Sequence, residues 1–164
     1  MEIHAFQPLK NGRIMIAESG PARIIEIDRG GKLLKEIKLK VDNPHPHRDT
    51  RLARKIENGK YLVSHEGDGV IREYDGDDGS VVWEYTVPLF GKARADGHGP
   101  EAFGNQAFSV LRLKNGNTLI GTGNGHSVLE VSPDKEIVWE LHQNDLPNIT
   151  FAWITTLEVL SNGN

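Results

Sequence analysis

Short apolar runs, each closed by turn-forming residues, recur along the whole chain. In residues 117–141, an apolar and partly β-branched run (118–120) is followed by an alternating run (127–131) and by a second apolar run (137–139). Gly, Asn, Pro and Asp bound these runs, and they are the residues that end strands and form turns. The pattern predicts three short strands that cannot bury both faces alone and therefore need further sheets of the same kind as neighbours.

The strand pattern repeats at a nearly constant interval. Asn-Gly pairs occur at 11–12, 58–59, 115–116 and 162–163, so their first residues lie 47, 57 and 47 positions apart. Equivalent positions after the first three pairs carry the same residue types, namely Glu26, Glu73 and Glu130, then Glu36, Glu84 and Glu140, with Trp83 and Trp139 just before the last two. A period near 47 residues with four strand-like runs is the size of one β-propeller blade.

The repeat therefore predicts an all-β fold, a β-propeller of four-stranded antiparallel blades. The chain would form a single partial propeller domain (1–164), with about three blades and one strand of a ring of roughly six to eight blades. Blade one (about 4–39) has expected strands at 4–9, 13–18, 22–28 and 32–39, and blade two (about 50–87) has them at 50–56, 60–65, 70–74 and 80–87. Blade three (about 107–141) has expected strands at 107–113, 117–121, 127–131 and 135–141. A strand at 154–160 would start blade four (about 154–164). Such a set is either a piece of a longer propeller or one half of a six-bladed ring that two copies close.

The repeats also carry a residue pattern that resembles a known kind of blade. The pattern is Leu/Ile-x-Asn-Gly-Asn/Lys-x-Leu-Ile/Val, then Glu-x-Asp, then Gly-x-Val-Val-Trp-Glu. It resembles the blades of quinoprotein-like (PQQ-type) propellers and is similar to the propeller of arylsulfate sulfotransferases. In blade two, Asp75, Gly79 and Trp83 match the Asp…Gly…Trp motif of the former, whose Trp docks adjacent blades. The departures are Lys35 in place of Trp in blade one, and Ser132 and Lys135 or Glu136 in place of Asp and Gly in blade three, which keeps Trp139.

Charge and composition exclude several classes of function. The 164 residues carry a net charge of −4, so no basic surface for nucleic acid or an anionic membrane is expected. No apolar run approaches the roughly 20 residues that a membrane-spanning helix needs. The absence of cysteine excludes disulfides, thiolate metal sites and a cysteine nucleophile. The first residues lack the basic start and apolar core of a secretion signal, whereas the family resemblance implies a periplasmic or secreted bacterial protein.

The long and unusual segments fall on one predicted face of the blades. The loops between second and third strands and the links between blades share this face, which we call the top face. Five of the seven histidines lie in these top-face segments, at His45, His47, His65, His98 and His126, and His4 and His142 lie at strand ends that point the same way. Loops on a rigid scaffold are where function tends to lie, so the top face is the predicted site.

Several interpretations of the top-face residues of the first two blades are open. His45 and His47 lie on one side of an extended segment and would chelate a metal together with His65 or Glu66. Alternatively, these Pro-flanked histidines cap a blade by hydrogen bonding to backbone carbonyls. His65 and Glu66 would form a general base with its orienting carboxylate, although adjacent residues at a strand end point in opposite directions.

The other candidates lie in the second half of the chain. His98 lies in a Gly-rich loop (96–100) that would close over the centre of the propeller, whereas His126, at a strand start, is expected to be structural. Trp153 would stack on a planar ligand or pack in the core, and Trp83 and Trp139 are expected to pack blades together.

The family resemblance implies two kinds of chemistry. PQQ enzymes hold the quinone between a Trp and a vicinal disulfide and use calcium, and half of that platform is absent in a chain without cysteine. Arylsulfate sulfotransferases use a His that is transiently sulfated. By that resemblance, the nucleophile would be His47, His65 or His98, and the sulfate would be bound by Arg48, Arg51 or Arg94.

The resulting hypothesis is a propeller scaffold that binds a small ligand or a protein partner at its top face. The predicted binding residues are His45, His47, Arg48, His65, Glu66, His98, His126 and Trp153. One alternative is a sulfotransferase-like or PQQ-dependent enzyme, and another is a purely structural interaction module. PQQ or a divalent metal is the candidate cofactor, and a second copy of the chain is the partner if two copies close a ring.

Overall fold

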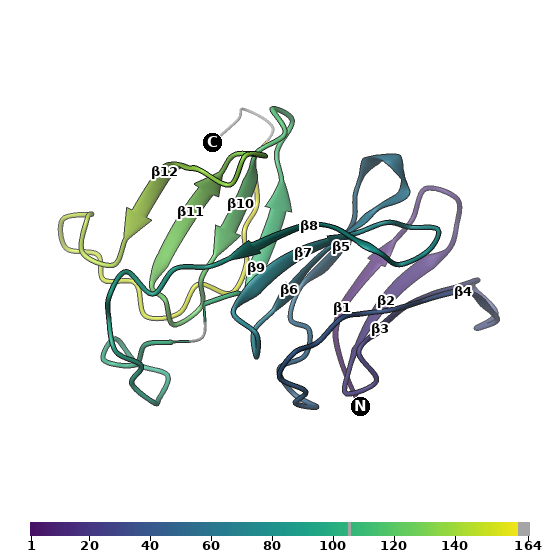
Figure 1. Ribbon diagram of the computed structural model, residues 1–164, viewed down its shortest axis with the longest axis horizontal. Coiled ribbons are helices and arrows are strands. Elements are labelled where there is room, and N and C mark those ends of the chain that lie inside the picture. The colour runs from purple at the N-terminus through teal and green to yellow at the C-terminus, as the bar shows by residue number, and fades with distance from the viewer. Residues whose placement is uncertain (105, 161–164) are drawn as a thin grey trace. The chain divides into compact units, whose positions relative to one another are not determined.

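Twelve β-strands form three four-stranded antiparallel sheets in the computed structural model, which describes residues 1–104 and 106–160. The chain divides into two compact units, Met1–Thr86 and Val87–Asn164. The first unit holds two of the sheets and the second unit holds one (Figure 1). No helix in the described residues is long and apolar enough to cross a membrane.

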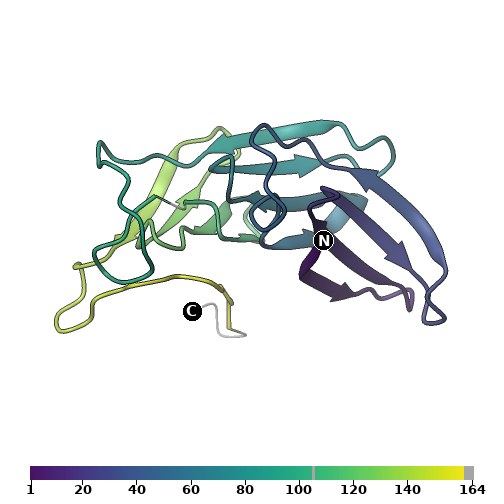
Figure 2. The same ribbon diagram turned by 90° about the horizontal axis from the view of Figure 1, so that it is seen from below.

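Each sheet takes its strands in the order of the sequence, joined by short hairpins (Figures 1 and 2). The first sheet contains β1 (Glu2–Pro8), β2 (Ile14–Ser19), β3 (Arg23–Ile27) and β4 (Leu33–Lys38). The second contains β5 (Ala53–Lys55), β6 (Tyr61–His65), β7 (Val70–Tyr74) and β8 (Val81–Thr86), with a 3-10 turn, η1 (Glu57–Gly59), between its first two strands. The third contains β9 (Ser109–Arg112), β10 (Thr118–Gly121), β11 (Ser127–Val131) and β12 (Ile137–His142).

The Asn-Gly pairs form the turns between the first two strands of each sheet. At Asn58 and Gly59 both φ angles are positive, 65° and 79°, as a type I′ hairpin turn requires. Gly12 and Gly116 also have positive φ angles, 81° and 90°, which glycine adopts without steric cost. The repeated dipeptide therefore has a backbone role in all three sheets.

A β-bulge recurs at the same place in the three sheets. The ladder between the third and fourth strands shifts immediately after Glu26, Glu73 and Glu130, which are the glutamates of the sequence repeat. Each glutamate pairs with the residue at the motif's Trp position, namely Lys35, Trp83 or Trp139. Because a bulge inserts one unpaired residue and increases the local twist, the repeat is one of backbone geometry as well as of sequence.

The two sheets of the first unit share one apolar core. Its buried members are Ala5, Met15, Ala17, Ile24, Ile37 and Leu39 from the first sheet and its end, and Ala53, Tyr61, Val63 and Tyr74 from the second sheet. Along β3 and the first four residues of β2, buried residues alternate with half-buried ones, as the period of two predicts for a sheet with one face against a neighbour. The two sheets therefore pack blade against blade.

A buried ionic cluster around Glu26 also joins these two sheets. One carboxylate oxygen of Glu26 accepts hydrogen bonds from Lys55 Nζ (2.5 Å) and the Tyr61 hydroxyl (2.6 Å), and the other accepts one from Arg13 (3.2 Å). Burial alone would raise the pKa of this carboxyl. The hydrogen bonds from Lys55, Tyr61 and Arg13 outweigh that effect and hold the pKa of Glu26 below its usual value.

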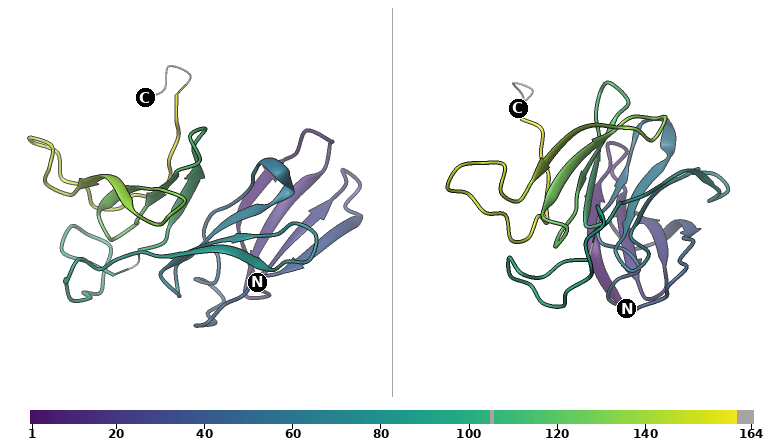
Figure 3. Two further views of the ribbon diagram at one scale, coloured as in Figure 1. Left: turned by 45° about the horizontal axis from the view of Figure 1, so that its top comes forward. Right: turned by 60° about the vertical axis from the view of Figure 1, so that its left-hand side comes forward.

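The second unit adds two irregular segments to its single sheet. Residues 87–104 and 106–108 precede β9 and contain an isolated bridge between Ala95 and Phe103, and the Phe108 N–H donates to the Gly121 carbonyl at the end of β10 (3.2 Å). Residues 143–160 follow β12 and return to the loop after β10, where Gly123 and Ile154 form a second bridge (Figure 3). Both segments are thus attached to the sheet of their own unit.

The prediction of an all-β fold with four-stranded antiparallel sheets is confirmed. The strand expected over 50–56 is reduced to β5, because the Ser64 hydroxyl accepts a hydrogen bond from the Leu52 N–H (2.8 Å) and interrupts the regular ladder. Residues 154–160 contain only the bridge at Ile154, not the expected strand. A fourth blade therefore stays a prediction, and its turn at 162–163 lies outside the described residues.

Candidate functional site

Glu2, His4 and His47 bring three metal-ligating side chains together in the first unit. The β1–β2 ladder shifts between Ile3 and Ala5, so His4 is the extra residue of a β-bulge. Bulges redirect side chains and are over-represented beside functional sites. His47 comes from the link between β4 and β5, so the three side chains converge from segments more than forty residues apart.

The convergence is on one oxygen atom of Glu2. His4 Nε2 lies 2.8 Å and His47 Nδ1 lies 2.5 Å from Glu2 Oε2, and the two imidazole rings meet edge to face at 5.2 Å between centroids. The other nitrogen of His4, Nδ1, donates a hydrogen bond to the carbonyl of Thr50 (2.7 Å). The side chain of His4 is 14% exposed, whereas those of Glu2 and His47 are 44% and 52% exposed. A partly buried imidazole is therefore fixed beneath two accessible ligands.

Electrostatics favour an ionised Glu2. The hydrogen bonds from His47 and then His4 lower the pKa of the Glu2 carboxyl below its ordinary value. A carboxylate in contact with two imidazoles is a combination that can bind a cation or position a polar ligand.

The link that carries His47 is held in place by two carboxylates. Asp49 is buried and accepts a hydrogen bond from the His45 N–H (2.5 Å). Asp68, in the loop between β6 and β7, accepts one from the Asn43 N–H (2.7 Å). After His47, the Asp49 N–H donates to the Ser19 hydroxyl (3.1 Å). Because backbone groups of the link are bonded to side chains both before and after His47, the position of His47 is set by the scaffold.

His45 and Arg48 lie in the same link but outside the three-residue cluster. His45 Nδ1 accepts a hydrogen bond from the His47 N–H (3.2 Å), so this ring faces its own backbone. Arg48 is half-buried, and its carbonyl accepts a hydrogen bond from the Gly67 N–H (2.9 Å) in the loop between β6 and β7. The imidazole that joins His47 is that of His4, not that of His45.

His65 and Glu66 form a buried polar layer. His65 is fully buried, with Nδ1 donating to the Asp49 carbonyl (2.6 Å) and Nε2 accepting from the Tyr74 hydroxyl (2.8 Å). Burial lowers the pKa of His65 to about 4, so the ring is neutral at neutral pH. Glu66 pairs with Arg51. With both ring nitrogens bonded inside the fold, His65 holds the link from below rather than facing a ligand.

The candidates of the second unit form a different arrangement. The exposed His98 ring lies 5.0 Å from the ring of Trp153, which in turn meets Phe108 at 5.4 Å. His126 is buried, and its Nε2 donates to the Ala102 carbonyl (2.5 Å). Arg94 donates to the Gly104 carbonyl. His98 and Trp153 are therefore brought together, whereas His126 resembles His65 in bonding to the backbone of a link.

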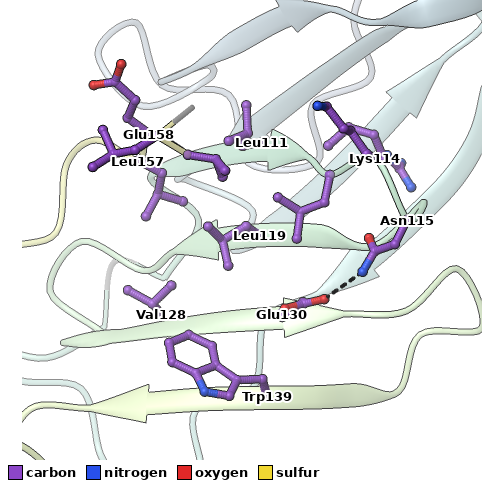
Figure 4. Close-up of a pocket in the computed structure, with 13 residues that line it drawn as sticks. Leu111, Lys114, Asn115, Leu119, Val128, Glu130, Trp139, Leu157 and Glu158 are labelled. Atoms are coloured by element: carbon purple, nitrogen blue, oxygen red, sulfur yellow. Dashed lines mark hydrogen bonds between the residues drawn. The ribbon is translucent and has the colours of Figure 1, made fainter. Parts of the chain in front are cut away.

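A groove of about 980 Å³ lies on one face of the third sheet. Leu111, Leu119, Val128 and Trp139, one from each strand, form a row across this face, and Leu157 borders it (Figure 4). Glu130 in the groove accepts hydrogen bonds from Asn117 (2.6 Å) and Asn115 (3.2 Å). The side chain of Trp139 remains about half exposed, so the groove is an accessible apolar surface.

The sequence predicts His47 as a binding residue but does not predict its partners. It places His4 only at a strand end and gives no reason to select Glu2. The missing signal is a contact between the first strand and a link that starts near residue 40, and one sequence does not reveal which strand residue meets which loop residue. The Glu-x-His spacing at the start of β1 was the one local hint.

Comparison with known proteins gives matches to solved structures. No family model matches the chain, and no curated protein matches it. A protein of unknown function from Bacteroides caccae is 21% identical, with a TM-score of 0.76, and the match covers 98% of this chain and 53% of that one. A streptogramin B lyase is 17% identical (TM-score 0.61, 90% and 41% covered), and BamB from Moraxella catarrhalis is 19% identical (TM-score 0.52, 85% and 38% covered).

These likenesses show the fold alone, because all three identities are low. Together with the three four-stranded sheets, they confirm a β-propeller. The chain spans about half or less of the length of the structures that it matches. The finer resemblance to PQQ-type propellers and arylsulfate sulfotransferases stays a prediction.

Proposed function

We propose that this chain is part of a β-propeller scaffold that binds a small polar ligand where Glu2, His4 and His47 converge. The observation that carries the proposal is the meeting of both imidazoles on one carboxylate oxygen, at 2.8 and 2.5 Å. Polar groups that converge on an accessible point are what a small-ligand site needs, because they fix the orientation of the ligand.

The surroundings of the cluster support a binding role. The layer beneath it is buried and internally bonded through Asp49, His65 and Tyr74. Glu2 and His47 remain about half exposed above that layer. Sites held by a rigid second layer lose little conformational entropy when a ligand binds. This arrangement favours binding over a purely structural use of the histidines.

Calorimetric titration with two probes tests the proposal, in buffer containing either a chelator or one equivalent of a divalent metal ion. The probes are pyrroloquinoline quinone and 4-nitrophenyl sulfate, which carry carboxylate and sulfate groups. We expect one of them to bind the wild-type chain and to lose at least about tenfold in affinity in His47→Ala, as when buried or fixed polar partners are removed. The matched control is His142→Ala, which changes a histidine of the second unit that is not among the predicted binding residues. Equal affinities in the two variants, or no binding of either probe, would contradict the proposed ligand site.

The enzyme alternative now depends on His47 and His98, because both ring nitrogens of His65 are bonded inside the fold. Turnover of 4-nitrophenyl sulfate that disappears in His47→Ala or His98→Ala would favour a sulfotransferase-like catalyst. Redox turnover that depends on added quinone would favour a PQQ-dependent one.

A second candidate function, assembly with another blade, is favoured by the groove on the third sheet. In the first sheet, the equivalent face is buried: Met15 and Ile24 are covered and Glu26 is bonded to Lys55 and Tyr61 of the next blade. In the third sheet, Trp139 and Leu119 occupy the corresponding face and line an open groove. A blade from a second copy of the chain would fit there.

Light scattering after size exclusion tests this second candidate. We expect the wild-type chain to elute as a species larger than the monomer and Trp139→Glu to be monomeric, because a charge would then face the apolar groove. Val138→Glu is the matched control, since Val138 is also exposed and is the unpaired bulge residue next to Trp139. A strictly monomeric wild-type chain would rule out assembly through this face.

A further inference from the structure

We propose that Glu2, His4 and His47 bind one divalent transition-metal ion of the zinc type. The inference deepens the proposed ligand site and rests on it for its functional meaning, because the ion would be the group to which the ligand binds. It is carried by the geometry of the three side chains and of the backbone that fixes them.

The donor set fits such an ion. One atom each from Glu2, His4 and His47 lie within 4.8 Å of one another, and they are two imidazole nitrogens and one carboxylate oxygen. Imidazole suits Zn²⁺, Cu²⁺, Ni²⁺ and Fe²⁺, whereas Mg²⁺ and Ca²⁺ prefer oxygen ligands. Three protein ligands leave a fourth position of a tetrahedral ion open, as in zinc sites that bind an exogenous molecule.

The orientation of His4 is that of a metal ligand. Its Nδ1–H donates to the Thr50 carbonyl, which directs Nε2 toward Glu2. Histidine ligands almost always donate their other ring N–H to a carbonyl or carboxylate, and this bond fixes both tautomer and ring direction. The β-bulge at His4 turns the side chain out of the regular alternation of β1 to make this contact.

Small shifts accommodate the ion. Ligand atoms about 2.0–2.1 Å from a tetrahedral ion lie roughly 3.3 Å from one another. The present separations from Glu2 Oε2 are 2.8 Å to His4 and 2.5 Å to His47, and the two imidazole nitrogens lie within 4.8 Å of each other. Each of these separations therefore has to change by no more than about 1.5 Å. The side chains of Glu2 and His47 are about half exposed and have room to rotate, while His4 stays fixed.

The chain offers a control pair with two of the three ligands. His142 Nε2 lies 3.3 Å from Glu140 at the end of β12 in the second unit, and the two side chains are 30% and 46% exposed. This pair has one imidazole and one carboxylate. Within the part of the chain that the structure describes, no third metal-ligating side chain joins it to form a three-residue cluster. A metal ion that required only an exposed His–Glu pair would bind there as well.

The experiment is equilibrium dialysis and calorimetry of the full chain, made without a polyhistidine tag, against Zn²⁺, with Mg²⁺ and Ca²⁺ for comparison. We expect one equivalent of Zn²⁺ and a loss of affinity of at least about tenfold in His47→Ala, His4→Ala and Glu2→Gln, since even outer-shell changes at metal sites cost about 10- to 100-fold. His142→Ala should bind like the wild type. Circular dichroism and urea unfolding show that each variant is folded, and the d–d absorption of bound Co²⁺ reports the two imidazole ligands.

The outcomes separate this inference from the proposed function. The metal site would be overturned if the stoichiometry and affinity of Zn²⁺ binding were unchanged in all three ligand variants. It would also be overturned if Mg²⁺ bound as tightly as Zn²⁺. If the organic probes bind in chelator while Zn²⁺ does not bind at all, the ligand site stands and the metal inference fails. If Zn²⁺ binds through His4 and His47 but neither probe does, the metal site stands and the proposed ligand function fails.

Discussion

The two units carry the same repeat and both bring histidines to their loops, but they use these residues in different surroundings. In the first unit, His4 and His47 meet a carboxylate, Glu2, above a buried polar layer. In the second unit, His98 meets Trp153 in an aromatic contact. The difference teaches that a histidine in a top-face loop is not in itself a site. What distinguishes the proposed site is the charged partner, Glu2, supplied by the bulged first strand.

The same contrast holds for the repeated glutamates. Glu26 is fully buried between two sheets and bonded to Lys55, Tyr61 and Arg13, whereas Glu130 faces an open groove and is bonded to Asn115 and Asn117 of its own sheet. The repeat determines where in the sheet the glutamate lies. Its contribution to stability depends on whether a neighbouring blade buries it and supplies hydrogen-bond donors.

The largest expected effect is on the buried layer of the first unit. His65→Ala removes a fully buried ring, leaves the Asp49 carbonyl without its His65 partner, and leaves the Tyr74 hydroxyl with the Lys40 carbonyl at 3.2 Å. We expect a loss of about 4 kcal/mol in the free energy of unfolding, from the cavity and the lost hydrogen bonds together. Urea unfolding followed by circular dichroism measures it. His98→Ala, on the exposed aromatic pair, should change stability by less than about 0.5 kcal/mol, and a similar loss in both variants would erase the distinction between the units.

The pH dependence of stability sharpens the same distinction. Burial lowers the pKa of His65 to about 4, from 6.5 for a histidine in an unfolded chain. Between these values the unfolded chain binds a proton that the folded chain does not, so this residue destabilises the fold progressively as the pH falls from about 6.5 to about 4, by up to about 3 kcal/mol. Comparison with His65→Gln in urea at several pH values isolates this contribution, because the variant lacks it. Parallel pH curves for the two proteins would show that His65 is not buried as a neutral ring.

The third prediction compares the two glutamates. Glu26→Gln should cost about 2–3 kcal/mol, somewhat less than the loss of one partner from a fully buried ion pair, because Lys55 and Arg13 keep partial contact with water. Glu130→Gln should cost less than about 0.5 kcal/mol, because its carboxylate is bonded only to side-chain amides beside an open groove. Urea unfolding of the two variants measures the difference, and equal losses would mean that Glu130 is covered as Glu26 is.

Much of the fold was predictable from the sequence because local rules determine it. The Asn-Gly turns need left-handed backbone at Asn58 and Gly59, and the alternation of apolar residues along β2, β3 and β11 sets which face is buried. The limits were also physical. The Ser64 hydroxyl shortens β5 through a side-chain bond, and a periodic pattern cannot reveal such a bond.

The site was predictable only in part. The concentration of histidines in loops pointed to His47, but the bulge at His4 depends on cross-strand register and the contact with Glu2 depends on how the link folds back. The same limitation made His65 a catalytic candidate, because its burial comes from Asp49 and Tyr74 rather than from its neighbours in sequence.

The measurement that tests the central claim most directly is side-chain NMR of ¹⁵N-labelled histidines during addition of one equivalent of Zn²⁺. The account predicts that the imidazole signals of His4 and His47 shift together, that the Nδ1–H of His4 remains bonded to Thr50, and that the signals of His98 and His142 stay in place. Shifts that are confined to the second unit, or that spread evenly over all the exposed histidines, would contradict it.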